Sequence, residues 1–299
     1  MKYHAQGAFS KRFNAIGMRL VPAYLFQGSK CNVLFDAGVS FAGPLYYHAL
    51  NQIFGNSQSL DYLFITHSHW DHCGALSYLK RYIPNMKIGG HHTVSSLFQK
   101  DSVIRTIRLY NEMIQDDQHS AYRRHVRFDG AGVDLPFKDG EIINLGDARC
   151  LVYETPGHTR DSVSYFIPEA EILISGEALG VPLGKDGEGV QVEFLNSYDD
   201  YLSSIQKLAA LKPKILCMAH EWVFTDDDVM RYFEKSYSET IVYRKLIERY
   251  LDETNGDVAQ AIEVMTRKEY DEAGTIYQTR FAYVLNLTAQ IAHVADKKV

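Results

Sequence analysis

The chain has 299 residues, of which 46% are hydrophobic and 23% are charged, a composition typical of one large globular domain or of a domain with an appendage. The net charge of −6 at pH 7 gives no basic field of the kind that binds nucleic acid. No apolar run is long enough to span a bilayer or act as an export signal, and the four scattered cysteines form no CxxC pair, so we expect a cytoplasmic protein that binds neither nucleic acid nor membrane.

Hydrophobic periodicity and turn residues predict short strands alternating with helices in the first half of the chain. In chain order these are a strand pair (18–28 and 31–38), a helix (43–54), a buried strand (61–66), a helix (74–84), a strand (85–90) and a polar helical insert (97–127). The strand at 61–66 therefore ends where a helix begins, which is a common position for ligand sites in α/β proteins.

The second half predicts a meandering antiparallel sheet followed by helices. Its elements are strands (141–146, 149–155, 162–169 and 171–176), a helix (197–211), a strand (214–220), and helices from about 226 to the end with a break at Asn255-Gly256. We divide the chain into a strand-rich domain, residues 1–225, and a helical C-terminal extension, residues 226–299. We expect the extension to act as a lid or as a substrate-binding element.

Three histidines and an aspartate occupy six consecutive positions in the segment THSHWDHCG, residues 66–74. The i, i+2 spacing of His67 and His69 on extended chain lets both imidazoles reach one ion. Asp71 and His72 follow where the chain enters a helix, so they should face a second, adjacent site. Nitrogen and carboxylate ligands without cysteine suit zinc, iron or manganese in a catalytic rather than a structural site.

Further candidate ligands lie at distant strand ends. His158 stands in the turn TPGHT between two predicted strands, Glu177 follows the strand EILIS, and His220 follows the strand KILCM. Each repeats the context of the first cluster, in which a polar residue comes directly after an apolar strand.

Together these segments resemble the HxHxDH signature and its downstream partners in the metallo-β-lactamase superfamily, over residues from about 18 to 225. The resemblance implies a mixed α/β (α+β) fold, a four-layer αβ/βα sandwich, here with the helical C-terminal extension. It also implies two divalent metal ions, zinc by default, with iron and manganese as alternatives. The implied ligands are His67, His69 and His158 for one ion, Asp71, His72 and His220 for the other, and Glu177 between them, with Asp36 supporting the metal loop through hydrogen bonds.

Glu177 departs from the family pattern, which has aspartate at this position. The side chain is longer by one methylene, in a type of site whose ligand distances tolerate only a few tenths of an ångström. Three alternatives stay open: the backbone retreats and Glu177 bridges, Glu177 binds one ion only, or the second site is weak. The second metal site is therefore the less certain one.

The resemblance implies a hydrolase that attacks with a metal-bound hydroxide, with Asp71 as the catalytic residue that also binds metal and orients the hydroxide. Chain length, the GEALG segment and the helical tail are similar to the quinolone-signal response proteins of bacteria, which are thioesterases of this fold; hydroxyacylglutathione hydrolases and acyl-homoserine lactonases are more distant. We therefore expect a small-molecule thioester or ester substrate. Lactone or phosphodiester hydrolysis is the alternative, and a metal-bearing ligand sensor with weak hydrolysis is a second one.

Two further groups of residues are interpreted from their context. Tyr277, Arg280 and Phe281 in the C-terminal helices are candidates for substrate binding. His91 and His92 are interpreted as the solvated start of a helix after a strand rather than as a metal pair, because no carboxylate is an evident partner. The oligomeric state is open, with a homodimer as one alternative.

Overall fold

A computed structural model describes residues 1–114, 126–276 and 278–297. Its strands form two seven-stranded sheets and a two-stranded hairpin. The first sheet has the order β1 (Lys2–His4), β16 (Trp222–Thr225), β15 (Ile215–Cys217), β12 (Ile172–Ile174), β11 (Val163–Ile167), β10 (Arg149–Glu154) and β9 (Ile142–Asn144). The second has the order β2 (Gly7–Ala8), β3 (Phe13–Met18), β4 (Val21–Gln27), β5 (Asn32–Phe35), β6 (Tyr62–Phe64), β7 (Lys87–His91) and β8 (Leu135–Phe137). The hairpin joins β13 (Val181–Leu183) to β14 (Gly189–Gln191).

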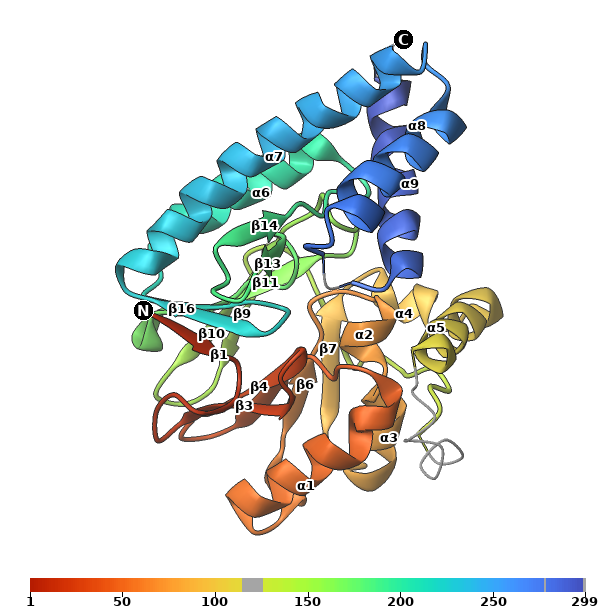
Figure 1. Ribbon diagram of the computed structural model, residues 1–299. Coiled ribbons are helices and arrows are strands. Elements are labelled where there is room, and N and C mark those ends of the chain that lie inside the picture. Colours follow the sequence, from red (N-terminus) through yellow and green to blue (C-terminus); the bar gives the residue numbers. More distant parts are fainter. Residues whose placement is uncertain (115–125, 277, 298–299) are drawn as a thin grey trace.

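The helices lie on the outer faces of the sheets and at the C-terminal end (Figure 1). They are α1 (Gly43–Phe54), α2 (Trp70–Cys73), α3 (Leu76–Tyr82), α4 (Val94–Leu97), α5 (Asp101–Met113), α6 (Tyr198–Ala209), α7 (Asp227–Glu253), α8 (Val258–Met265), a π-helical turn (Thr266–Glu272) and α9 (Arg280–Asp296).

Three buried clusters give the molecule its layers. One cluster, which includes Phe35, Phe64 and Tyr165, fills the space between the two sheets. A second packs α1, α3 and α5 on the outer face of one sheet, and a third packs α6 to α9 on the outer face of the other. Helix, sheet, sheet and helix thus follow one another, and the predicted αβ/βα sandwich is confirmed.

Parallel strand pairs bring the candidate site residues together. The parallel pair β5 and β6 places Phe35 beside Phe64, so the residues that follow these strands start from adjacent points. The parallel pair β12 and β15 places Ile174 beside Cys217, with the same effect on the residues that follow. Since parallel neighbours end at the same edge of a sheet, the loops after β12 and β15 lie side by side. The loop after β6, in the other sheet, meets them where Thr66 approaches Gly176.

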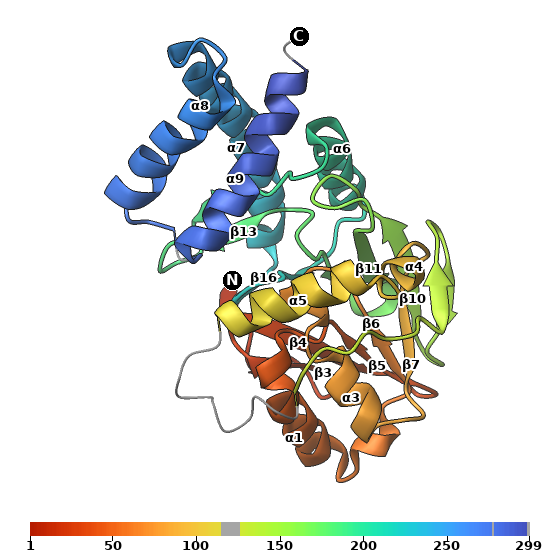
Figure 2. The same cartoon turned by 90° about the vertical axis from the view of Figure 1, so that its right-hand side faces the viewer.

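The C-terminal helices stand over this converging edge. Figure 2 shows the N-terminal end of α9 above α5, and the rings of Phe281 on α9 and Tyr110 on α5 lie 5.3 Å apart. Helix α7 packs along α6 and against β16. No helix in the described parts of the chain is long and apolar enough to cross a membrane.

Two sequence predictions need correction. Within the helical insert expected over 97–127, the described residues form one helix, α5 (Asp101–Met113), and residues 126–134 form an irregular segment; residues 115–125 lie outside the described ranges. The C-terminal helices have a second break after the π-helical turn, where Gly274 takes a left-handed φ of 61°. The glycine-rich segment after Glu177, for which no element was predicted, folds as the hairpin β13–β14, whose short strands pair with each other.

Candidate metal centre

Two groups of side chains meet where the two sheets converge. The first contains His67, His69, His158 and Glu177, and the second contains Asp71, His72, Glu177 and His220. In each group the candidate ligand atoms lie within 4.8 Å of one another. These are the two sets that the family resemblance implied, with Glu177 common to both; the ligand roles themselves stay a prediction.

The carboxylate of Glu177 reaches both groups. Its Oε1 lies 3.1 Å from Nε2 of His72 and 3.2 Å from Nε2 of His220. Its Oε2 lies 3.5 Å from Nε2 of His158. Of the three alternatives raised by the longer side chain, this geometry agrees with the bridging one.

Gly176, which precedes Glu177, allows the two strand-end loops to approach closely. Its φ is 56°, in the left-handed region that favours glycine. A Cβ atom at this position would lie 2.9 Å from Cβ of Thr66. A larger residue here would therefore force the loop that carries Glu177 away from the loop that carries His67.

Hydrogen bonds behind the histidines fix which ring nitrogen faces inward. Nδ1 of His158 lies 2.7 Å from the carbonyl oxygen of Glu193, and Nδ1 of His220 lies 2.8 Å from that of Leu20. A carbonyl oxygen can only accept, so each Nδ1 carries a proton, and Nε2 is the atom of each ring that is available to bind a metal ion. Nδ1 of His72 likewise faces the Asp36 carboxylate at 3.0 Å. Such outer partners are typical of metal-binding histidines.

Asp36 supports the loop from behind, at the position expected for a supporting residue. This buried carboxylate, whose φ is 63°, accepts hydrogen bonds from the backbone N–H and the hydroxyl of Thr66. Because the Thr66 hydroxyl donates to Asp36, its oxygen accepts from Nδ1 of His67, 3.0 Å away. Nε2 of His67 is therefore unprotonated, and this buried atom has no hydrogen-bond partner.

These residues fit a pair of divalent ions. An unprotonated, buried and unpartnered Nε2 is costly unless it binds something, and that of His67 lies 3.9 Å from Oε1 of Glu177. Nδ1 of His69 and Nε2 of His158 face each other at 3.0 Å. Five imidazoles and two carboxylates converge, which is the donor chemistry of zinc, iron and manganese sites.

Burial and neighbouring charges shift the pKa values of the histidines, downward for His67 and His69 in the first group and upward for His72 in the second. Burial, together with the adjacent His158, lowers the pKa of His69 to about 4; burial and the His72 ring also lower the pKa of His67. Burial acts in the same direction on His72, but the carboxylates of Asp71 and Asp36 outweigh it and raise its pKa. His67 and His69 are thus neutral imidazoles, whereas the carboxylates of the second group attract positive charge, from a proton or from a metal ion.

Two cavities open onto these groups. The larger, about 320 Å³, is lined by Asp71 and His220 together with mainly apolar residues, among them Val39, Trp70 and Leu183. The smaller, about 210 Å³, is lined by His69, Asp71, His158, Glu177, Trp70, Tyr110 and residues of α9. Asp71 and Trp70 line both, so they stand where the two cavities meet. Sequence reasoning missed Trp70, although it lies inside the motif.

The three predicted substrate-binding residues lie in different surroundings. Phe281 lines the smaller cavity. Arg280 lines neither of the two cavities and forms an ion pair with Asp271 on the surface, with Nε 2.8 Å from Oδ1. A role of Arg280 in substrate binding stays a prediction. Tyr277 lies outside the described residues.

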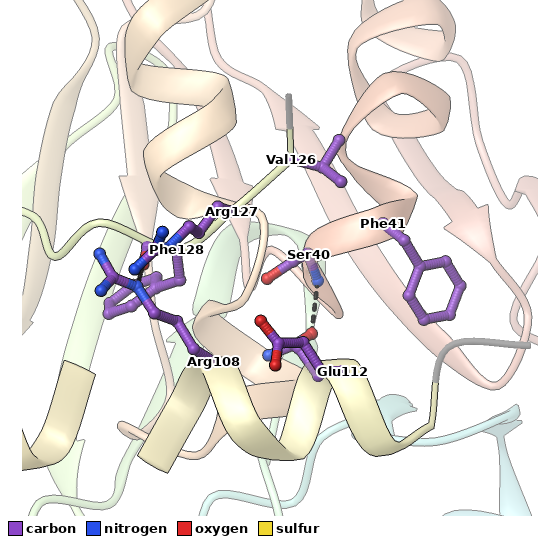
Figure 3. Close-up of a pocket in the computed structure, with 8 residues that line it drawn as sticks. Ser40, Phe41, Arg108, Glu112, Val126, Arg127 and Phe128 are labelled. Carbon is purple, nitrogen blue, oxygen red and sulfur yellow. Dashed lines mark hydrogen bonds between the residues drawn. The ribbon is translucent and has the colours of Figure 1, made fainter. Parts of the chain in front are cut away.

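Asn111 on α5 forms hydrogen bonds that hold the loop carrying the motif of residues 66–74. The Oδ1 atom of this buried residue accepts the backbone N–H of Ser40 at 2.7 Å, the bond drawn at Ser40 in Figure 3. Its Nδ2 donates to the carbonyl oxygen of Trp70 at 3.1 Å. The small cavity in Figure 3, about 60 Å³ and lined by Phe41, Arg108 and Phe128 among others, contains no residue of the two groups.

A buried glutamate that sequence reasoning missed links the site to α9. The side chain of Glu193 accepts hydrogen bonds from Gln191, Gln278 and Asn286, and its backbone oxygen orients His158. Burial, helped by the charge of Glu177, raises the pKa of Glu193 well above its ordinary value. Burial therefore favours the neutral acid form of Glu193 in the folded chain.

We expect Glu193→Gln to stabilise the fold increasingly as the pH rises. The folded chain holds a proton on Glu193 that the unfolded chain releases above a pKa near 4.5, so native stability falls with rising pH by about 1.4 kcal/mol per unit until the folded-state pKa is reached. Glutamine stays neutral and avoids this loss. In thermal unfolding from pH 5.5 to 8, the melting temperature of the variant should rise relative to that of native protein. For the exposed control Glu234→Gln, the difference in melting temperature from native protein should stay constant. A constant difference for Glu193→Gln would contradict the raised pKa of Glu193.

Comparison with known proteins places the chain in a family. The family model described as the metallo-beta-lactamase superfamily matches residues 16–220. The chain belongs to the metallo-β-lactamase superfamily. This superfamily consists of metal-dependent hydrolases, and its fold typically binds divalent ions, in agreement with the two groups of histidine and carboxylate ligands.

Relatives within the superfamily are distant in sequence. Human acyl-coenzyme A thioesterase MBLAC2 is 24% identical over 210 residues, which cover 67% of this chain and 71% of that protein. The hydroxyacylglutathione hydrolase of Aliivibrio fischeri is 26% identical over 227 residues, covering 68% and 73%. A metallo-beta-lactamase family protein from Thermus thermophilus has the same fold, with a TM-score of 0.68, 18% identity, and coverage of 97% of this chain and 95% of that one.

Proposed function

We propose that this chain is a metal-dependent thioesterase that hydrolyses thioesters with an apolar acyl group. The observation that carries the proposal is the larger cavity, whose mainly apolar lining reaches Asp71 and His220 of the candidate metal centre. Apolar walls with a few polar groups at one end suit an acyl chain whose carbonyl carbon lies at those polar groups.

Two ions are proposed, one held by His67, His69 and His158, the other by Asp71, His72 and His220, with Glu177 between them. When bound, divalent ions polarise a carbonyl oxygen and lower the pKa of a water molecule toward neutrality. The carboxylate of Asp71, whose Oδ2 lies 3.8 Å from Nε2 of both His72 and His220, orients the attacking water at the junction of the cavities. Trp70 lies at the same junction, and Phe281 lines the smaller cavity beside it.

The lining favours a thioester over a phosphodiester. Among the described residues that line the two cavities there is no lysine or arginine, whereas phosphate groups are commonly bound by such cations. A thiol has a pKa near 8.5, so a thiolate leaves without needing a proton from the protein. Two of the relatives named above are also thioester hydrolases by name, an acyl-coenzyme A thioesterase and a hydroxyacylglutathione hydrolase. The closer likeness to quinolone-signal response proteins stays a prediction.

A substrate panel tests this function directly. Purified full-length chain, supplied separately with zinc, manganese or iron, is assayed with acyl thioesters of increasing chain length, with an acyl-homoserine lactone and with a bis-aryl phosphate. We expect the highest kcat/KM for a thioester, and a value that rises with the length of the acyl chain. A higher value for the lactone or the phosphate would overturn the thioesterase assignment, and tight ligand binding without turnover of any substrate would favour a sensor.

Narrowing the larger cavity should change chain-length preference. Leu183 lines it from the hairpin β13–β14, and we expect Leu183→Trp to exclude the distal part of a long acyl chain. Each methylene left unburied costs about 0.8 kcal/mol, so four excluded methylenes lower kcat/KM roughly 200-fold. Short acyl thioesters should be hydrolysed as before. Leu45→Trp, at an exposed position on α1, is the control, and an equal loss for short and long chains would contradict this use of the cavity.

A further inference from the structure

A third cluster of potential ligands lies outside the metal centre, at the ends of two strands from different sheets. His91 ends β7 and Glu154 ends β10. Nε2 of His91 lies 3.3 Å from Oε1 of Glu154, and Nδ1 of His92 lies 3.8 Å from the same oxygen. The interpretation of a solvated helix start is therefore wrong for His91, which is a buried strand residue, and the carboxylate that the sequence did not reveal comes from the other sheet. His92, in contrast, is exposed in the turn that precedes α4.

We infer that His91, His92 and Glu154 form an additional binding site for a divalent transition-metal ion of the zinc class. Ligand atoms about 2.1 Å from a tetrahedral ion lie about 3.4 Å from one another. The separations of 3.3 and 3.8 Å agree with that spacing, and they exceed the 2.7–2.9 Å typical of a charge-assisted hydrogen bond. They also match the separations of 3.0 to 3.9 Å at the candidate metal centre.

The surroundings of the cluster favour a metal over a simple ion pair. Nδ1 of His91 lies 2.7 Å from the Thr93 hydroxyl, an outer partner that directs Nε2 toward Glu154. Burial and the adjacent His92 ring lower the pKa of His91, so its ring is neutral near pH 7, the form that binds metal. The side chains of His92 and Glu154 are 42% and 34% exposed, which gives an ion access from solvent and leaves room for water as a fourth ligand.

The position of this site gives it a structural consequence. An ion there would join the end of β7 to the end of β10, and so one sheet to the other. Glu154 directly precedes the turn that carries His158. An ion bound at this site would therefore stabilise the turn that carries His158, a candidate ligand of the main centre, but it would not take part in the reaction itself.

Zinc titration of the full-length chain tests the third site. Native protein is compared with His92→Ala and Glu154→Gln, both at partly or well exposed positions, and with His48→Ala, which removes an exposed histidine on α1. We expect both cluster variants to bind one zinc equivalent fewer than native protein, or to bind the weakest equivalent at least tenfold less tightly, while His48→Ala behaves as native. Circular dichroism without added metal should show the same fold in all four.

The readout is a difference between variants, so it does not depend on how many ions the main centre holds or on any activity. Equal stoichiometry and affinity in all four proteins would overturn the third site. A loss of one equivalent in the two cluster variants would support it even if the main centre bound a single ion.

Discussion

In the His92→Ala background, which removes the third site, replacing Glu177 with alanine is expected to reduce bound metal from two ions per chain to one or fewer and to lower thioester hydrolysis by more than 100-fold. Glu177 is the shared member of the two ligand groups, and its removal leaves the imidazoles and Asp71 without the carboxylate that lies between them. Loss of an outer-shell partner alone costs about 10–100-fold in metal affinity or activity, so loss of a shared ligand should cost more. Elemental analysis and kcat/KM on the same samples measure both effects.

Two further variants make the Glu177 experiment specific. Glu177→Asp restores the carboxylate at a shorter reach, and it should retain more metal than the alanine variant. Glu234→Ala removes an exposed glutamate from α7 and should leave metal content and hydrolysis unchanged. If Glu177→Ala kept two ions per chain, the bridging role of this carboxylate would be wrong.

Replacing Asp71 with asparagine should lower kcat by about 10²- to 10⁴-fold, the range for loss of a group that handles the proton of the attacking water. Asp71 lines both cavities and lies beside the second ligand group. The first group, with His67, His69 and His158, does not include Asp71, so at least one ion should remain bound. KM should change much less than kcat.

The matched control for Asp71→Asn is Asp200→Asn, at an exposed position on α6. It should leave kcat, KM and metal content as in native protein. Near-native kcat in Asp71→Asn would show that Asp71 does not orient the nucleophile. A fall in kcat that merely parallels a complete loss of metal would assign Asp71 a ligand role alone.

The candidate site was predictable because its residues follow apolar strands that are visible in the sequence. His67, Glu177 and His220 come shortly after β6, β12 and β15, and the parallel neighbours β12 and β15 end together. The helix α1 was also predicted with its observed bounds, since Pro44 near its start and Gly55 after its end mark both termini. Local signals of this kind need no knowledge of distant segments.

The features that sequence reasoning missed depend on segments far apart in the chain. In the stretch 190–194 apolar and polar residues alternate, which predicts one buried and one solvated face. Glu193 is nevertheless fully buried, because α9 covers the polar face with Gln278 nearby and Asn286 bonded to its carboxyl group. The partner of His91, Glu154, likewise lies in the other sheet. The burial of Glu193 and the partner of His91 are therefore both determined by contacts between distant segments, which local sequence patterns do not reveal.

The central claim, that the two ligand groups hold catalytic ions, is tested most directly by metal content per chain measured together with thioester turnover. Native protein should contain close to two metal equivalents at the main centre, counted in the His92→Ala background so that the third site does not contribute. A chelator should abolish turnover, and added metal should restore it. Metal content near zero, with no binding on reconstitution and no turnover, would contradict the account.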